Sequence, residues 1–223
     1  MRPKILYVEL KKKFENEGLN LHLLDKIPGK TVSLASVIQY ISLIPIVKDY
    51  LEKKGKKIII KKGAYYPAHV IGCNATAFDK NSDTLLLISD GKFHAINNAL
   101  QLNREIYVFN TNKLEKISKE EIDKLKIKSK AKLNKFFLAD KVGILISIKP
   151  GQNYKKVAID KLISRFEKLN KKVYLFESDN INPAEFENFS DIQIWINTAC
   201  PGLSIDDARI LNLCDIISFL SKK

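Results

Sequence analysis

The sequence predicts an α/β fold made of two similar domains, each with a parallel sheet and flanking helices. Three observations predict it. Apolar strand-like segments alternate with amphipathic helical segments, a strand–helix–strand unit occurs twice, and each copy continues to a loop that contains a cysteine. Such alternation is typical of parallel sheets that are covered on both faces and joined by right-handed crossovers.

The first copy begins at the apolar segment 32–36. Apolar residues three and four positions apart predict a helix over 44–54, which Gly55 would end. The other elements expected in this copy are strands over 56–60, 84–89 and 105–109, a helix over 94–102, and a shorter strand over 68–72 that leads to Cys73.

The second copy begins with a strand over 142–146, followed by a helix over 154–169 that would end at Asn170. We expect Val157, Leu162 and Phe166 on the buried side of this helix. Strands over 171–176 and 192–196 follow, and Cys200 lies just past the second of them. Because the carboxyl ends of parallel strands are where ligands gather, both cysteines are expected at such ends, in matching loops of the two copies.

Between the copies, residues 118–140 form a charged segment that begins Ser-Lys-Glu-Glu, a sequence that suits a helix capping box. We therefore expect a connecting helix from about residue 118 and a domain boundary near residue 140. The predicted domains are 1–140, with Cys73, and 141–223, with Cys200.

The composition argues for a cytosolic globular protein. Hydrophobic residues make up 45% of the 223 residues, and no apolar run approaches the roughly 18 residues of a membrane span. The apolar stretch near the amino terminus is too short for a secretory signal. A membrane location is therefore not expected.

The net charge of +13 comes almost entirely from lysine. Arginine, which reads nucleic-acid bases with a planar guanidinium, is scarce, so we expect no direct nucleic-acid readout. A basic surface would still attract RNA, a ribosome or an acidic protein. A lysine-rich genome or a hot habitat explains the charge equally simply, and we prefer that interpretation.

The three cysteines, at positions 73, 200 and 214, are too few and too widely spaced for a disulfide framework. Buried structural thiols are the default interpretation, and Cys214, in an apolar stretch, is expected to be one. Two cysteines at equivalent places in duplicated domains also fit a shared metal centre. Thiolates suit iron–sulfur clusters or zinc, although the paired C-x-x-C spacing common in zinc sites does not occur here.

Several loops follow one another in an order that resembles the 2-(3-amino-3-carboxypropyl)histidine synthase family, which catalyses the first step of diphthamide synthesis. The resemblance runs from about residue 3 to about residue 207. It rests on Ile-Gly-Cys-Asn-Ala-Thr (71–76), Leu-Ile-Ser-Asp-Gly-Lys-Phe-His (87–94), Val-Gly-Ile-Leu-Ile-Ser-Ile-Lys-Pro-Gly-Gln (142–152), Ile-Asn-Thr-Ala-Cys-Pro (196–201) and Ile-Asp-Asp (205–207).

The resemblance implies three similar α/β domains around one 4Fe-4S cluster, with one cysteine from each domain and the fourth position left for S-adenosyl-L-methionine. By position, Cys73 is similar to the ligand of the middle domain and Cys200 to that of the carboxyl-terminal domain. The implied reaction is a radical transfer of a 3-amino-3-carboxypropyl group from S-adenosylmethionine to a histidine of translation elongation factor 2.

The family's first domain, with the first cysteine, has no counterpart in these residues. The resemblance therefore implies a separate polypeptide that carries this domain, in a dimeric or larger assembly. The alternative is a non-catalytic partner subunit that supports or reduces a cluster-bearing subunit.

The same motifs indicate three further candidate sites. His94 would act in catalysis or orient the substrate, or else only begin a helix. The segment Lys149, Pro150, Gly151 and Gln152 would present backbone N–H groups and an amide to the carboxylate or amine of S-adenosylmethionine, or else only turn the chain. Asp206 and Asp207 would cap a helix after Cys200.

Overall fold

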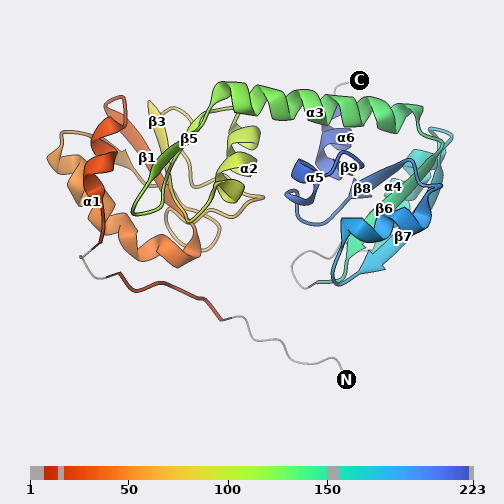
Figure 1. Ribbon diagram of the computed structural model, residues 1–223, viewed down its shortest axis with the longest axis horizontal. Coiled ribbons are helices and arrows are strands. Elements are labelled where there is room, and N and C mark those ends of the chain that lie inside the picture. Colours follow the sequence, from red (N-terminus) through yellow and green to blue (C-terminus); the bar gives the residue numbers. More distant parts are fainter. Residues whose placement is uncertain (1–7, 15–17, 150–155, 221–223) are drawn as a thin grey trace. The chain divides into compact units, whose positions relative to one another are not determined.

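The computed structural model of the protein describes residues 8–14, 18–149 and 156–220 (Figure 1). The chain divides into two compact units, residues 1–122 and 123–223, and the division falls inside helix α3 (Lys119–Leu138). The boundary expected near residue 140 lies just beyond the other end of this helix. Each unit has its own sheet and its own core, which confirms the predicted fold class.

The sheet of the first unit has the strand order β2-β1-β3-β4-β5. Its strands are β1 (Thr31–Ser36), β2 (Lys57–Ile59), β3 (Thr84–Ile88), β4 (Ile106–Phe109) and β5 (Leu114–Ile117). The first four are parallel, as predicted, whereas β5 pairs antiparallel with β4. Only four residues join β4 to β5, which is too short for a crossover, so β5 has to run antiparallel.

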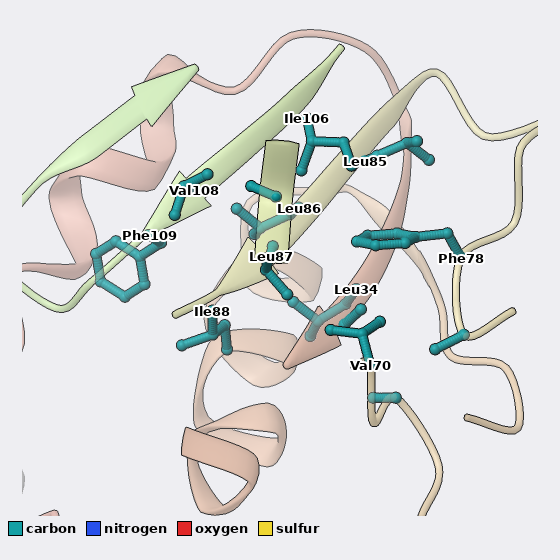
Figure 2. Close-up of a cluster of buried hydrophobic side chains, with 14 of the residues drawn as sticks. Leu34, Val70, Phe78, Leu85, Leu86, Leu87, Ile88, Ile106, Val108 and Phe109 are labelled. Atoms are coloured by element: carbon teal, nitrogen blue, oxygen red, sulfur yellow. The ribbon is translucent and has the colours of Figure 1, made fainter. Parts of the chain in front are cut away.

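The core of the first unit forms around β1 and β3, which are buried on both faces. All five residues of β3 are buried, and Leu34 of β1 pairs with Leu86 (Figure 2). Phe78, from the long connection between β2 and β3, packs into the same cluster. The helical elements of this unit are η1 (Leu21–Lys26), η2 (Ile38–Leu43), α1 (Ile44–Lys53) and α2 (Lys92–Leu102).

The second unit has a four-stranded, fully parallel sheet in the order β7-β6-β8-β9. Its elements are β6 (Lys141–Ser147), α4 (Lys156–Glu167), β7 (Lys172–Ser178), η3 (Pro183–Phe189), β8 (Ile194–Asn197), α5 (Leu203–Asp206), β9 (Ile210–Asn212) and α6 (Leu213–Leu220). Two buried clusters hold this sheet. Phe136 and Phe166 belong to one, and Trp195 stacks on Phe186 in the other, with ring centroids 4.2 Å apart.

Three helices end at a residue with a left-handed backbone. Gly55 follows α1 with φ of 78°, Asn103 caps α2 with φ of 53°, and Asn170 follows α4 with φ of 57°. Glycine and asparagine tolerate this conformation best, so they end helices with little backbone strain. The predicted stops at Gly55 and Asn170 are thereby confirmed.

Two local predictions are wrong. The segment before Cys73 forms no strand, only two isolated bridges, one between His69 and Ser36 and one between Ile71 and Asn74. Pro67 has no N–H to donate and Ala68 has φ of 64°, so a ladder cannot extend through them. On α4, Val157 is 65% exposed, and Ile159 takes the buried position instead.

No helix in the described part of the chain is both long enough and apolar enough to cross a membrane.

Substituting Gly143 tests the packing between β6 and β8. A Cβ added there would lie 2.7 Å from Cε3 of Trp195 and 3.1 Å from Cγ2 of Ile192. We expect Gly143→Ala to lower the free energy of unfolding by about 1–3 kcal/mol, the usual cost of overpacking a core. Urea denaturation measures this. Gly91→Ala, where a Cβ meets open space, is the control. It should lower stability by about 0.5 kcal/mol, less than Gly143→Ala, because its only cost is a poorer N-cap for α2. Equal effects of the two substitutions would contradict the packing described here.

Candidate functional site

Cys73 lies in a tight turn over 71–74, which the N–H of Asn74 closes by donating to the carbonyl of Ile71 at 3.0 Å. The turn lies near the carboxyl edge of the first sheet, because the nearby His69 bridges the last residue of β1. Gly72 packs closely on the first turns of α2, where an added Cβ would lie 3.3 Å from Phe93. The side chain of Cys73 is exposed.

Two carboxamide side chains of α2 hold this turn. Nδ2 of Asn98 donates to the carbonyl of Ile71 at 3.2 Å and to that of His94 at 2.7 Å. Nε2 of Gln101 donates to the carbonyl of Gly72 at 3.0 Å. The carbonyls of the cysteine turn are therefore bound to a helix that begins at the carboxyl end of β3.

His94 lies at the start of α2, beside the same turn. An added Cβ on Gly72 would lie 3.9 Å from Cδ2 of His94. Burial lowers the pKa of His94, and the nearby His69 lowers it further. The imidazole is therefore neutral at pH 7 and can accept a proton. The structure thus brings His94 and Cys73 to one place, while the role of each stays a prediction.

His69 is buried beneath this region. Its pKa is lowered mainly by burial, and the acidic Glu9 opposes this shift. Nδ1 of His69 and Oδ1 of Asn98 are buried and have no hydrogen-bond partner among the described residues. Because buried polar atoms usually have a partner, an ordered water is the simplest occupant beside them.

The loop after β3, over 89–91, is tied to the amino-terminal segment 8–14. Asp90 accepts hydrogen bonds from the hydroxyl of Tyr40 and, at 2.9 Å, from Nζ of Lys12. The same lysine donates to the hydroxyl of Tyr40 at 2.6 Å. These contacts hold the loop that leads into α2 and His94.

Cys200 is half-buried and lies three residues beyond the end of β8. Its carbonyl accepts hydrogen bonds from Nδ2 of Asn197 at 2.8 Å and from the N–H of Leu203 at 3.1 Å. Oδ1 of Asn197 accepts the N–H of Ala199 at 2.9 Å. The last residue of β8 therefore folds the cysteine loop back onto the end of its own strand.

A second asparagine, at the end of β9, braces the same loop. Oδ1 of Asn212 accepts from Nδ2 of Asn197 at 2.8 Å, and its Nδ2 donates to the carbonyl of Pro201 at 3.1 Å and to Oγ of Ser204 at 2.6 Å. Nζ of Lys132, on α3, donates to the carbonyl of Ser204. Burial lowers the pKa of Lys132.

The two cysteines do not occupy matching connections. In the first sheet β3 lies next to β1, on the side opposite β2. In the second sheet β8 lies next to β6, on the side opposite β7, so β8 corresponds to β3. Cys200 follows β8, whereas Cys73 lies in the connection between β2 and β3. The prediction of matching loops is therefore wrong. Both cysteines nevertheless lie at the carboxyl edge of their own sheets.

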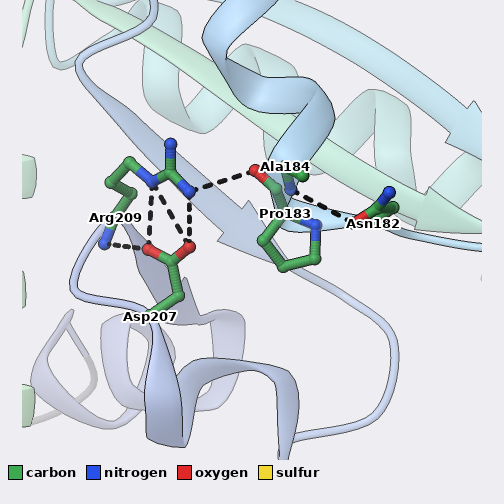
Figure 3. Close-up of polar contacts among 5 residues, drawn as sticks. All are labelled: Asn182, Pro183, Ala184, Asp207 and Arg209. Carbon is green, nitrogen blue, oxygen red and sulfur yellow. Dashed lines mark hydrogen bonds and ion pairs between the residues drawn. The ribbon is translucent and has the colours of Figure 1, made fainter.

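Asp206 and Asp207 lie at the carboxyl end of α5, so they do not cap its start as expected. Asp207 forms an ion pair with Arg209 at 2.8 Å, and Nη2 of Arg209 also donates to the carbonyl of Pro183 at 3.0 Å (Figure 3). The hydrogen bonds from Arg209 lower the pKa of Asp207. This pair links the α5–β9 connection to η3 and leaves the aspartate a structural role.

Cys214 is exposed on α6, so the expectation of a buried thiol is wrong. The sulfur is nevertheless crowded by its neighbours, and this partial burial, with the nearby Asp215, raises the pKa of the thiol to about 11. Since a metal binds the thiolate, the raised pKa makes Cys214 a weaker ligand than an unperturbed cysteine.

Lys149 is exposed just past the end of β6, and its N–H donates to Oγ of Ser147 at 3.2 Å. The rest of this expected site, Pro150, Gly151 and Gln152, lies outside the described residues. Two surface hollows lie elsewhere. One, of about 500 Å³, runs along α4, and the other, of about 400 Å³, lies at the amino ends of β3 and β4.

The described thiols do not form a complete metal site by themselves. Among the described residues, no three His, Cys, Asp or Glu side chains come together as a metal site. The first unit instead presents Cys73 near the carboxyl edge of its sheet, and the second presents Cys200 and Cys214 there, just past the ends of β8 and β9. Thiolates are the ligands that iron–sulfur clusters require, so each cysteine fits one corner of a cluster rather than a complete site.

Comparison with known proteins identifies the family. The family profile "Putative diphthamide synthesis protein" matches residues 1–211, which is nearly the whole chain. The chain belongs to the diphthamide synthesis family. This confirms the resemblance found in its sequence motifs.

Members of the diphthamide synthesis family with assigned names are similar to most of this chain. The 2-(3-amino-3-carboxypropyl)histidine synthase of Methanocaldococcus jannaschii is 31% identical over 82% of the chain and 48% of its own length. Subunit 1 of the Schizosaccharomyces pombe enzyme is 26% identical over 91% of the chain and 49% of its own length. The chain therefore spans about half the length of these relatives.

The fold is also that of a solved family member. The crystal structure of Dph2 from Pyrococcus horikoshii superposes with a TM-score of 0.78, at 22% identity, over 92% of this chain and 61% of that one. Dph2 has also been solved with a 4Fe-4S cluster, and that structure superposes with a TM-score of 0.76.

The sequence motifs did not reveal the carboxamides that hold the two cysteine loops. The turn contact of Asn197 could have been predicted from the sequence, because an asparagine side chain often accepts a hydrogen bond from the N–H two residues later. Asn98 and Gln101 lie one and two helical turns beyond His94, and only the docking of the turn on α2 gives them a role. Asn212 lies in a strand that was not predicted.

The lowered pKa of His94 gives a testable pH dependence. An unfolded histidine has a pKa of about 6.5. Because the folded pKa lies lower, the unfolded chain binds more protons as the pH falls through 6.5, and stability is lost until the folded pKa is reached. His94→Gln removes this term, so the variant should lose less stability than the parent between pH 7.5 and pH 5.

Urea denaturation across that pH range, with an NMR titration of the His94 ring, measures both quantities. A ring that titrates at or above pH 6.5, or equal losses of stability in the two proteins, would contradict the burial of His94.

Proposed function

We propose that this chain is a component of a 2-(3-amino-3-carboxypropyl)histidine synthase, in which Cys73 and Cys200 are ligands of a 4Fe-4S cluster. The observation that carries the proposal is that Cys73 and Cys200 lie in loops at the carboxyl edges of the two sheets, in a chain of the diphthamide synthesis family. Cys214 follows β9 at the same edge as Cys200, but its pKa is raised to about 11. Its relatives are named for this activity, and a related fold has been solved with the cluster.

The proposed reaction transfers a 3-amino-3-carboxypropyl group from S-adenosylmethionine to a histidine of translation elongation factor 2. A reduced cluster with one open iron would supply the electron that breaks the bond between sulfur and the γ-carbon, by a noncanonical radical mechanism. The chain's own contribution is to hold two of the cluster's thiolates, to orient the reactants and to exclude water.

The third thiolate of a cluster with one open iron has to come from polypeptide beyond these 223 residues. The sequence has three cysteines, and the third, Cys214, has a pKa raised to about 11. We therefore propose an assembly in which another segment, carried by a separate polypeptide in a dimer or larger complex, completes the site. Because the substrate is a translation factor, the proposed location is the cytoplasm.

His94 is proposed to act on the substrate histidine. After radical addition, the imidazole ring has to lose a proton and one electron, and the cluster would take the electron back. A neutral imidazole beside the Cys73 turn can accept the proton or orient the substrate ring. Lys149 and the adjoining Pro150, Gly151 and Gln152 are proposed to bind the carboxylate or amine of S-adenosylmethionine. Lys149 follows the carboxyl end of β6, on the same edge of its sheet as Cys200.

The ligand assignment predicts a pattern of iron binding in the assembled complex. Cys73→Ala and Cys200→Ala should each abolish loading of the cluster, because each removes a thiolate. Cys214→Ala should leave it intact. Iron quantification and absorbance near 400 nm after anaerobic purification measure the loading. Equal iron in all three variants would reject the assignment.

The need for a third ligand predicts that the 223 residues alone are inactive. After reconstitution with iron, sulfide and dithionite, they should transfer no 3-amino-3-carboxypropyl group to elongation factor 2 until a polypeptide with the third cysteine is added. Mass spectrometry of the factor measures the transfer.

Two other outcomes of this experiment are informative. Full transfer by the 223 residues alone would overturn the prediction and make Cys214 the candidate third ligand. An active complex in which Cys73→Ala and Cys200→Ala both retain cluster and activity would favour the non-catalytic partner subunit.

A further inference from the structure

We infer that two pairs of carboxamides, Asn98 with Gln101 and Asn197 with Asn212, are positioning residues that set the geometry of the Cys73 and Cys200 thiols. The inference deepens the proposed function, since it assumes that these thiols act as ligands. The pairs are called the carboxamide braces below.

The braces connect distant parts of the chain. Asn98 and Gln101 donate to carbonyls 27 and 29 residues away, and Asn212 donates to one 11 residues away. Each of these three carbonyls, on Ile71, Gly72 and Pro201, lies within two residues of a cysteine.

Other asparagines of the chain make a different kind of contact. Asn110 accepts from N–H groups two and three residues away, and Asn182 accepts from one two residues away. Those are local turns. The braces instead fix a cysteine loop to a helix or to a neighbouring strand.

The chemistry of a carboxamide suits this task. A cluster with thiolate ligands is negatively charged, so a nearby carbonyl oxygen repels it and a nearby N–H stabilises it. An amide that binds the carbonyls of a cysteine loop keeps them turned towards the protein and adds no net charge. Such supporting contacts orient metal ligands and tune the metal.

In the Cys200 loop the two asparagines of the brace are also hydrogen-bonded to each other. Asn197 donates to the carbonyl of Cys200 and to Asn212, which donates to the carbonyl of Pro201 and to Ser204. Asn197 is 2% exposed, so an amide lost here is not replaced easily by water. Two consecutive carbonyls, at and after the cysteine, are therefore held by two strand ends.

In the Cys73 turn part of the brace is exposed, so one of its hydrogen bonds can be removed with little effect on folding. Gln101 is exposed on α2, and alanine at a helical surface position preserves the helix. Gln101→Ala therefore removes a bond to the carbonyl of Gly72 with little risk to folding. Gln101→Arg restores an N–H donor at the same place.

The first experiment needs no cluster. In a Cys73→Ser and Cys214→Ser background, Cys200 is the one remaining thiol, and its rate of reaction with iodoacetamide reports how firmly its loop is held. Asn212→Ala should raise this rate by about fivefold or more, because releasing a hydrogen-bonded loop exposes the thiol. Asn182→Ala, which removes a local asparagine contact in the same unit, should leave the rate within twofold of the parent.

Because the Cys73 thiol is already exposed, its turn is tested by hydrogen exchange of the Asn74 N–H, whose bond to the carbonyl of Ile71 closes the turn. Gln101→Ala should raise this exchange rate, Gln101→Arg should return it towards the parent value, and Asn110→Ala is the control. Unchanged rates in both Gln101→Ala and Asn212→Ala, with all variants folded by circular dichroism, would overturn the inference.

The second experiment uses the assembled, cluster-loaded complex and separates the inference from the proposed function. Asn212→Ala should change the electron paramagnetic resonance spectrum or the reduction potential of the cluster, which loss of stability alone would not do. If the wild-type complex binds no cluster, the proposed function fails, and the thiol rates still decide whether the braces exist. If Asn212→Ala binds a cluster with an unchanged spectrum and potential, the inference fails while the proposed function stands.

Discussion

The burial of two interior strands, β1 and β6, is the constraint on which the rest of this chain depends. Each is paired with a parallel strand on both sides, and nearly all residues of each are buried. A strand in this position offers no surface for function along its length. Side chains that bind a ligand can lie only in the loops at its ends, and parallel pairing brings the carboxyl ends to one edge.

The two units meet this constraint in different ways. In the second, β8 stops at Asn197 and the chain turns directly into the Cys200 loop. In the first, the corresponding strand β3 leads to the Asp90 loop and His94. Its cysteine, Cys73, lies instead in the connection between β2 and β3. A proline and a left-handed alanine, Pro67 and Ala68, prevent that connection from joining the sheet as a strand. Duplication of the fold therefore does not require duplication of the connection that carries the thiol.

Neutral groups predominate around the thiols. Carboxamides hold both cysteine loops, and the histidines near Cys73 have lowered pKa values because they are buried. Lys132 also supports the Cys200 loop, by a hydrogen bond from α3 to the carbonyl of Ser204. Hydrogen bonds rather than charge pairs thus determine where the thiols lie. A cluster that gains and loses electrons would be tuned here mainly by hydrogen bonding and access of water.

The sequence by itself determined the fold class, the positions of most strands and helices, the helix ends at Gly55 and Asn170, and the family. These features are local, because hydrophobic periodicity and a left-handed residue act over a few positions, and motif order needs no contacts at all. Only the tertiary structure decided which connection carries Cys73, that Val157 and Cys214 are exposed, and that Asn98, Gln101 and Asn212 brace the cysteine loops. Each of these depends on which segments pack together, and the carboxamide contacts join residues 11 to 29 positions apart. The periodicity of the sequence does not determine such packing.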